Sequence, residues 1–389
     1  MKIPGGSQTL SKSKAVLPVD FPPYLDRGRG ATVWDENRSY TDWICGLGAV
    51  GLGYGYPSVE QAAIDQIGRG VSFSLPTRIE ADVAYALGAL FPDEAVRFVK
   101  TGSEACAAAV RIARISTGRD RVIVCGYHGW HDWYVASRPV HPGVPEALTQ
   151  LVSTFEYNDV RSLTAALAGP TPPAAVMMEA VLHDPPGPGF LPTVQELAHG
   201  AGALFILDET ITGFRCHRGG ARARYGLAPD LTVLGKAMGN GWPIAAVLGS
   251  DKHMRDGATP ISSTFGGEAV ALAAAEAVIR AYRNEDVCGT IETMGTRLQG
   301  ALLAALPDPF IVDGMPWKPR VKHPDRRELY RWVQNMARRG HLIHPLGMFV
   351  SYSHTAQQVD WLADAARKAA ESSEPLVGEP PVPPFQLRT

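Results

Sequence analysis

The sequence predicts an α/β fold in which a mostly parallel sheet is flanked by helices and accompanied by a smaller α+β domain. From about residue 92 to residue 282, short apolar runs alternate with helical patterns. Strands that are apolar on both faces are typical of a parallel sheet covered by helices. The expected strands are AVRFVK (95–100), RVIVC (121–125), AAVMMEAV (174–181), ALFILDE (203–209), LTVLG (231–235) and PIAAVLG (243–249).

A helix is expected between the first two strands, in the alanine-rich stretch SEACAAAVRIARIST (103–117). Ser103 is a suitable N-cap, and Gly118 follows the last helical residue, as is common at helix C-termini. Further helical patterns cover about 289–305 and 325–339. A last helix should begin after Thr355, because Thr355 and Gln358 have the spacing of a capping box, and no internal repeat is present.

The change of pattern after Cys288 indicates a second domain. We expect residues 1–48 to form the N-terminal segment of a small domain, residues 49–287 a large domain, and residues 288–389 the C-terminal part of the small domain. The last stretch, EPLVGEPPVPPFQLRT, has too many prolines for a helix and should be extended or disordered.

Composition favours small-molecule chemistry. Charged residues make up 20% of the 389 residues and the net charge is −2, so the chain has no basic field for nucleic acid. No apolar run is long enough to span a membrane, and the N-terminus has no secretory apolar segment, so a cytoplasmic protein is expected. The five cysteines are scattered without CxxC spacing, which favours buried thiols over disulfides or a metal site.

Two strands deliver charged side chains to the edge where open α/β sheets bind ligands. Asp208 ends one apolar strand, and Lys236 follows another, 28 residues later. Asp208 alone would be read as a helix-capping residue. A buried lysine is costly unless it is neutralised, paired or used covalently, and a Schiff base with an aldehyde cofactor is one such use. The two residues therefore suggest one shared site.

Pyridoxal phosphate needs a lysine, an acid for its ring nitrogen, an anion site for its phosphate and a flat group over its ring. Gly102 and Ser103 open the alanine-rich helix, where free N–H groups attract phosphate. Tyr127 and His128 follow a strand in a glycine-flanked turn, and Tyr127 could stack on a ring. His128 is equally well explained as a loop histidine bonded to backbone or water.

Taken together, the motifs resemble the class III pyridoxal-phosphate aminotransferases of fold type I. The likeness is greatest to the branch that contains glutamate-1-semialdehyde aminomutase and the aminotransferases of sugars and aminoglycosides. It covers nearly the whole chain, in the order that the family has. The motifs are PGGSQTLSK, GLGYGYPSVEQA, TGSEACAAAVRIAR, GYHGWHDW, LDETITGFR, GKAMGNGWPIAAVLG and STFGGEAVALAAA.

The resemblance implies a role for each site residue. Lys236 would form the imine with the cofactor and move protons, and Asp208 would pair with the pyridinium nitrogen. The phosphate would be held by Gly102 and Ser103. The remaining roles fall to Tyr127, stacked on the ring, His128 beside it, Glu179 near the cofactor hydroxyl, and Thr264, which would reach the phosphate of the neighbouring subunit in a homodimer.

Three departures from the family pattern stand out. Thr210 occupies a position that commonly carries a branched aliphatic residue packed on the ring, and its hydroxyl is unusual there. The sequence EAV after residue 178 replaces the frequent EPV, which weakens the assignment of Glu179. The chain is also some tens of residues shorter than usual, with the loss in its C-terminal half.

The reaction expected from this resemblance is transfer of an amino group from an amino acid, with glutamate the expected donor, to a carbonyl of a polar metabolite. A sugar, aminocyclitol or aminoglycoside intermediate would be such an acceptor. Glutamate-1-semialdehyde 2,1-aminomutase and a pyridoxal-phosphate epimerase are the alternatives. A binding protein that uses Lys236 and Asp208 as structural ions would not need the phosphate and stacking motifs as well.

Overall fold

The computed structural model describes residues 2–92, 95–256 and 261–381. The chain divides into a small unit, Met1–Tyr56 with Gly289–Thr389, and a large unit, Pro57–Cys288. Residues 49–56 were expected in the large domain but belong to the small unit. The reason is a bridge between Gly30 and Tyr54 and a hydrogen bond from Ser353 Oγ to the Leu52 carbonyl (2.6 Å).

The large unit is built on one sheet, which the described residues form from seven strands in the order β4-β10-β9-β8-β7-β5-β6. All six expected strands are present, and β10 is antiparallel to both of its neighbours while the others run parallel. The mostly parallel sheet is thereby confirmed. Its strands are β4 (Ala95–Val99), β5 (Val122–Cys125), β6 (Val152–Thr154), β7 (Ala175–Glu179), β8 (Leu204–Asp208), β9 (Leu231–Leu234) and β10 (Ala245–Gly249).

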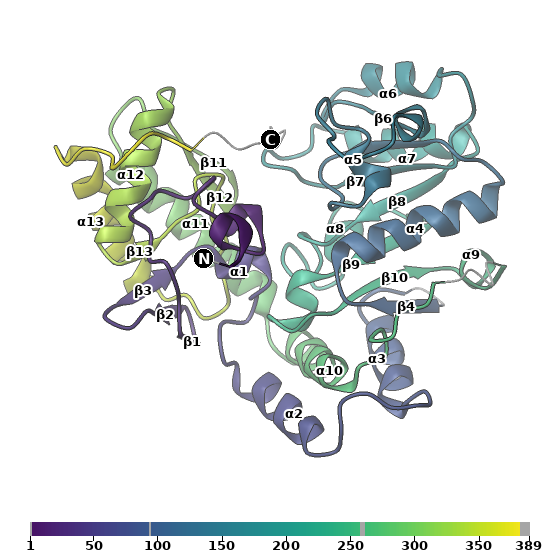
Figure 1. Cartoon of the computed structure of the whole chain (residues 1–389), viewed down its shortest axis with the longest axis horizontal. Helices are drawn as coiled ribbons and strands as arrows, with labels where there is room; N and C mark the ends of the chain where they lie inside the picture. The colour runs from purple at the N-terminus through teal and green to yellow at the C-terminus, as the bar shows by residue number, and fades with distance from the viewer. Residues whose placement is uncertain (1, 93–94, 257–260, 382–389) are drawn as a thin grey trace. The chain divides into compact units, whose positions relative to one another are not determined.

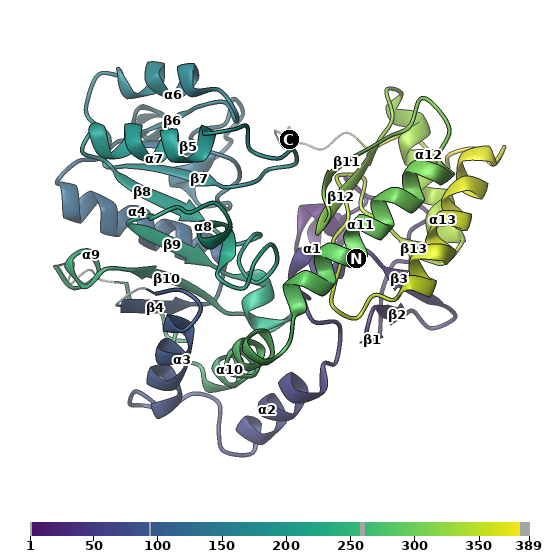
Figure 2. The same cartoon turned by 180° about the vertical axis from the view of Figure 1, so that it is seen from behind.

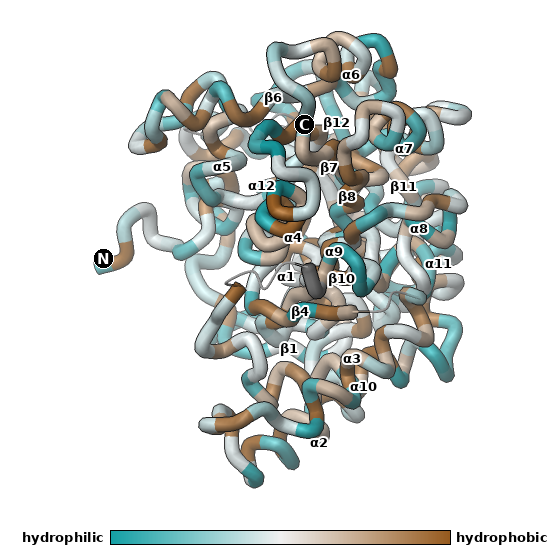
Figure 3. Tube along the Cα trace, turned by 90° about the vertical axis from the view of Figure 1, so that its right-hand side faces the viewer, coloured by the Kyte–Doolittle hydropathy of each residue, from teal (hydrophilic) through white to brown (hydrophobic). Residues whose placement is uncertain are grey.

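Helices cover the sheet, as Figures 1 and 2 show from opposite sides. The longest in contact with it is α4, whose buried alanines, among them Ala105 and Ala109, allow close approach to the strands. Figure 3 shows hydrophobic residues along β8, four of whose five residues are buried. The α-helices are α2 (Pro57–Ile67), α3 (Arg78–Gly88), α4 (Gly102–Thr117), α5 (Asp132–Val135), α6 (Val160–Leu167), α7 (Phe190–Gly200), α8 (Gly220–Arg224), α9 (Asp251–Asp256) and α10 (Ala269–Asn284), with 3₁₀ turns η3 (Glu146–Leu151) and η4 (Lys236–Gly239).

The small unit combines a sheet in the order β1-β2-β3-β13, a two-stranded β11-β12 hairpin and helices. The last helix begins after Thr355, whose capping box with Gln358 is confirmed. Its elements are η1 (Pro4–Gly6), η2 (Leu10–Lys12), β1 (Arg27–Arg29), β2 (Thr32–Trp34), β3 (Ser39–Asp42), α1 (Cys45–Gly48), α11 (Val287–Ala305), β11 (Ile311–Met315), β12 (Lys318–Lys322), α12 (Arg326–Arg338), β13 (His341–Leu342) and α13 (Ala356–Glu371).

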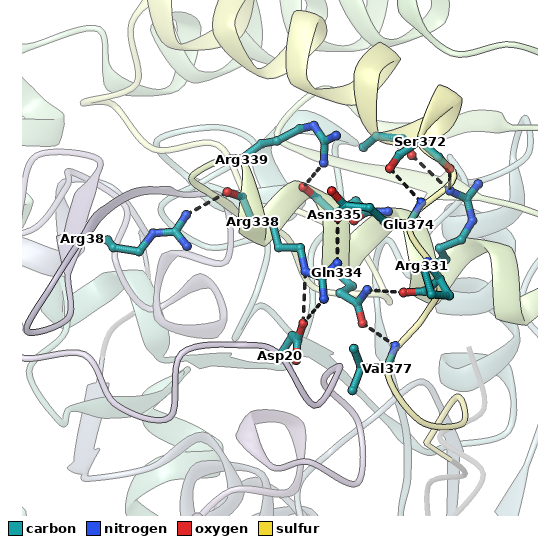
Figure 4. Close-up of polar contacts among 12 residues, drawn as sticks. Asp20, Arg38, Arg331, Gln334, Asn335, Arg338, Arg339, Ser372, Glu374 and Val377 are labelled. Carbon is teal, nitrogen blue, oxygen red and sulfur yellow. Dashed lines mark hydrogen bonds and ion pairs between the residues drawn. The ribbon is translucent and has the colours of Figure 1, made fainter.

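The chain after α13 lies against α12 without regular structure, as its prolines predict. Gln334 on α12 donates to the Pro375 carbonyl (2.9 Å) and accepts from the Val377 backbone N–H (2.8 Å), as Figure 4 shows in part. Arg338 forms ion pairs with Asp20 and with Glu374. These contacts tie both ends of the chain to α12; the final residues of the proline-rich stretch lie outside the described part.

Candidate active site

Most of the predicted site residues gather at one edge of the large unit's sheet. Strands β5, β7, β8 and β9 are parallel, and Glu179 and Asp208 stand at the carboxyl ends of β7 and β8 as register partners. Tyr127 follows β5 and Lys236 follows β9. Because parallel strands end at the same edge, four segments that are distant in sequence deliver their polar side chains to one place.

Lys236 begins the short turn η4 and has a left-handed backbone, with φ of 44°. This conformation is unusual for a residue other than glycine and often marks a functional site. The residue as a whole is partly exposed, but its ammonium group is surrounded by protein. Burial by the surrounding protein lowers the pKa of its ammonium, although the carboxylates of Glu179 and Asp208 oppose that effect. A lysine with a lowered pKa is more readily neutral and nucleophilic.

Asp208 is 2% exposed at the end of β8, and both of its carboxylate oxygens have hydrogen-bond partners. Its Oδ2 lies 2.8 Å from His128 Nδ1 and its Oδ1 accepts the Thr210 backbone N–H at 2.9 Å. Burial alone would raise the pKa of Asp208, but the hydrogen bonds from His128 and Thr210 outweigh it and leave that pKa lowered. The carboxylate is therefore a fixed negative charge at the carboxyl end of β8.

His128 is oriented from both sides. Its Nδ1 faces Asp208 and its Nε2 lies 3.1 Å from the carbonyl oxygen of Cys125. Both partners are oxygen atoms that accept hydrogen bonds, so each ring nitrogen of His128 faces an acceptor. The two contacts fix the orientation of the ring, and the ring in turn holds the Asp208 carboxylate in place. His128 is buried, so its ring does not reach solvent.

The start of α4 has free backbone donors of the kind that bind anions. The backbone N–H groups of Gly102 and Ser103 have no hydrogen-bond partner among the described residues. The N-cap is Thr101, not Ser103 as expected, because a complete capping box is formed by Thr101 and Glu104, two residues earlier than expected. This correction leaves Ser103 inside the first turn, where its N–H joins the free donors. The C-cap at Gly118 is confirmed, with a left-handed φ of 65°.

Glycines let these segments approach one another. A Cβ added at Gly102 would lie 2.9 Å from Thr210 Cγ2, and one added at Gly129 would lie 2.3 Å from Ser103 Oγ. Gly235 faces the same Thr210 methyl. The start of α4, the turn after β5 and the chain leading to Lys236 are thus packed too closely for larger residues.

Tyr127 and Glu179 are joined across the strand ends. Glu179 Oε1 accepts the backbone N–H of Tyr127 at 2.8 Å, and Glu179 is 7% exposed. Tyr127 is 48% exposed, and its ring meets Tyr134 edge-on at 5.7 Å between centroids. One face of Tyr127 is therefore available to a flat ligand, while Glu179 also holds the loop that carries it.

Two predicted residues behave differently from the rest. Thr210 Oγ1 is buried and has no hydrogen-bond partner among the described residues, although its backbone holds Asp208. An orphaned buried hydroxyl beside a carboxylate suggests a missing partner. Thr264 is exposed, and no described contact joins it to Lys236 or Asp208. Its assignment to a neighbouring subunit's site remains a prediction.

Cys106 belongs to the site but was predicted only as a buried thiol. Its Sγ lies 3.4 Å from Asp208 Oδ2, and the sulfur, the His128 nitrogen and the carboxylate oxygen lie within 4.8 Å of one another. Burial and the neighbouring Asp208 raise the pKa of Cys106 well above its usual range, so it remains a thiol and donates to the carboxylate. The spacing from Ser103 to Cys106, three residues on one helix, was the available signal.

The residues present fit pyridoxal phosphate. Free N–H groups at the start of α4 suit its phosphate, the fixed carboxylate of Asp208 suits a protonated ring nitrogen, and the lysine of lowered pKa suits its aldehyde. The unpartnered hydroxyl of Thr210 lies between these groups.

Known proteins share sequence similarity with this chain. The family model described as aminotransferase class-III matches residues 18–313. The chain is 31% identical to a 3-aminobutyryl-CoA aminotransferase from Cloacimonas acidaminovorans, over 94% of this chain and 93% of the relative. It is 37% identical to a glutamate-1-semialdehyde 2,1-aminomutase from Chloroflexus aurantiacus, over 73% and 72% of the two chains.

Solved structures show the same fold. The PLP internal aldimine form of the FumI protein of Sphingopyxis sp. MTA144 matches with a TM-score of 0.90 and 29% identity, over 95% of this chain and 93% of that one. An omega-transaminase from Sphaerobacter thermophilus matches with a TM-score of 0.84 and 27% identity, over 95% and 94%. The expected fold type I is confirmed, the cofactor is pyridoxal phosphate, and the chain belongs to the class-III aminotransferase family.

Proposed function

We propose that this aminotransferase moves an amino group from an amino-acid donor, with glutamate the expected one, to a carbonyl of a polar metabolite. A sugar, aminocyclitol or aminoglycoside intermediate would be such an acceptor. The observation that supports an amino-transfer site most directly is the left-handed Lys236 beside the fixed carboxylates of Glu179 and Asp208. The acceptor class rests on the resemblance of the motifs GGSQTLSK and GYHGWHDW to sugar-acting relatives.

Each residue has a definite task in this proposal. Bound pyridoxal phosphate supplies an electron sink that weakens bonds at the amino-bearing carbon. Asp208, pinned by His128 and Thr210, keeps a proton on the ring nitrogen, which maintains that sink. Lys236 removes a proton from the substrate carbon and returns one during amino transfer. Gly102 and Ser103 hold the phosphate, and Tyr127 covers one ring face.

A second candidate, an aminomutase, is favoured by the 37% identical relative. The names of the relatives also share a chemical feature, because 3-aminobutyryl-CoA, glutamate 1-semialdehyde and omega-amino substrates all carry or receive nitrogen at a carbon that is not next to a carboxylate. A sugar carbonyl has the same property. We therefore include carbonyl acceptors of this wider class in the test.

The deciding experiment follows the first half-reaction. Glutamate and a panel of other amines are added singly to the holoenzyme, and both the visible spectrum and the release of 2-oxoglutarate or the matching carbonyl product are measured. Acceptors are then added: keto sugars, glutamate 1-semialdehyde and 3-oxoacyl thioesters. Donor-dependent product supports intermolecular transfer. Isomerisation of one substrate without any donor would overturn it in favour of the aminomutase or an epimerase.

We also propose a homodimer. Large apolar side chains are exposed around the segment between α2 and α3, next to Thr264 and Phe265 (56% exposed). The two segments adjoin, since Ala269 N donates to the Val71 carbonyl at 2.9 Å. Exposed apolar groups of this kind mark interaction surfaces. They are Ile64, Ile67, Val71, Phe73, Leu75 and Tyr85.

Sedimentation velocity measures the mass directly, and a monomer at micromolar concentration would exclude a stable dimer.

No helix among the described residues is long and apolar enough to cross a membrane, and the cytoplasmic location stays a prediction.

A further inference from the structure

The small unit contains a groove that lies outside the residues of the amino-transfer site. Its volume is about 500 Å³, and it lies between the sheet strands β2, β3 and β13 and the helix α13. Strand residues form its floor, while α13 and the end of α12 form its rim. The residues that matter here are Thr32, Thr41, His341, Arg339, Trp361 and Lys368.

The floor is a row of polar side chains in register. Thr32 pairs with Thr41, and Thr41 pairs with His341, so the three side chains point to the same face of the sheet. Thr41 is 8% exposed and His341 4% exposed. Neither the Thr41 hydroxyl nor His341 Nε2 has a hydrogen-bond partner in the part of the chain that the structure describes. Both residues line the groove, so the acceptor that these two donors lack would come from a ligand or from solvent in the groove.

The chemistry of His341 is defined by a second contact. Trp43 Nε1 donates to His341 Nδ1 at 3.3 Å, and an indole can only donate. The Nδ1 atom must therefore be the acceptor, which places the proton of the neutral ring on Nε2. The floor consequently offers an N–H donor from His341 and a hydroxyl from Thr41 on neighbouring strands.

The rim carries net positive charge and a flat apolar surface. Lys368 is paired with Asp364 (2.6 Å). One guanidinium nitrogen of Arg339 donates a hydrogen bond to the Asn335 carbonyl (3.1 Å), as Figure 4 shows. Arg339 forms no ion pair with an acid among the described residues. Trp361 is 56% exposed. The rim therefore carries two cations, Arg339 and Lys368, and one carboxylate, Asp364. The indole of Trp361 lies on the same rim.

From this arrangement we infer that the groove binds a small organic carboxylate with a flat apolar body, at a site separate from the amino-transfer residues. The two carboxylate oxygens would accept from Thr41 and His341. Arg339 supplies the opposite charge at the rim, and the apolar body lies along Trp361. The donors outnumber the acceptors, which is why an anion and not a cation is expected.

Phenylacetate is the probe, added to holoenzyme labelled with fluorotryptophan and observed by fluorine NMR. The Trp361 resonance is assigned from the line that disappears in Trp361→Phe. We expect this line to shift saturably, with a dissociation constant on the order of 1 mM for so small a ligand. The neutral analogue 2-phenylethanol should shift it far less, because it lacks the charged acceptor.

Variants make the test specific. Thr41→Val keeps the side-chain shape and removes the hydroxyl, so binding should weaken about 3- to 10-fold, the range for one hydrogen bond. Arg339→Gln should weaken it similarly. Thr164→Val, the same substitution on the exposed face of α6, is the matched control and should bind like the wild type. Unchanged spectra of the free variants show that they fold.

Three results would overturn the inference: no shift of the Trp361 line at tens of millimolar phenylacetate, an equal shift with 2-phenylethanol, or wild-type binding by Thr41→Val. Phenylacetate bound at the amino-transfer site would instead change the visible spectrum and leave the Trp361 line unmoved. Binding in the groove and failure of the proposed amino transfer are therefore observed separately.

Discussion

Asp208→Asn tests the electrostatic design of the site. The substitution keeps the shape of the side chain but removes a charge that is 2% exposed and lies 2.8 Å from His128. Removing one member of a buried charge pair costs about 3 to 5 kcal/mol. If this loss is felt in the transition state, kcat/KM falls roughly 150- to 5,000-fold, at about 1.36 kcal/mol for each factor of ten. Cofactor affinity should also fall, because the ring nitrogen loses its partner.

The chain offers a close control in Asp230→Asn. Asp230 also faces a histidine, with Oδ2 2.8 Å from His199 Nε2, but it precedes β9 and so lies at the other end of the strand from Lys236. The assays are the single-turnover rate with glutamate, or with the donor that the screen finds, and the cofactor concentration that restores apoenzyme. We expect near wild-type values for Asp230→Asn. A rate within a few-fold of wild type for Asp208→Asn would refute the reasoning.

Three further changes have defined outcomes. Gly129→Ala should weaken cofactor binding and lower the free energy of unfolding by about 1 to 3 kcal/mol, because the backbone φ is 100° and an added Cβ would lie 2.3 Å from Ser103 Oγ. Titration of the apoenzyme with cofactor measures the first effect, and urea unfolding measures the second. Thr264→Ala should speed cofactor release and leave the mass in sedimentation unchanged if the partner's phosphate is its target; unaltered release would remove that role. Burial lowers the pKa of His344 from 6.5 to about 4, so between these pH values the unfolded chain binds the proton more tightly than the folded one, and stability falls as pH falls. The free energy of unfolding should be about 2 kcal/mol lower at pH 5 than at neutral pH. Urea unfolding of His344→Gln should show a smaller loss over the same pH range.

The strands and helices were largely predictable because their signals are local. Each expected strand is a short apolar run, and the capping box at Thr355 is contained within four residues. The strand Val152–Thr154 was missed because three residues at a sheet edge have too weak a pattern. The N-cap at Ser103 was wrong by two residues, since Thr101 with Glu104 gives a better capping box than the residues that follow.

The sequence by itself determined the cofactor chemistry, because Asp208, Lys236 and the start of α4 each lie directly after an apolar run, where a parallel sheet must present them. Only the tertiary structure decided which groups act on one another. Cys106 meets Asp208 across 102 residues, and Trp43 selects the tautomer of His341 across 298. Such contacts depend on how helices and strands pack, and the hydrophobic pattern of a segment shows that it is buried but not which distant residue it meets.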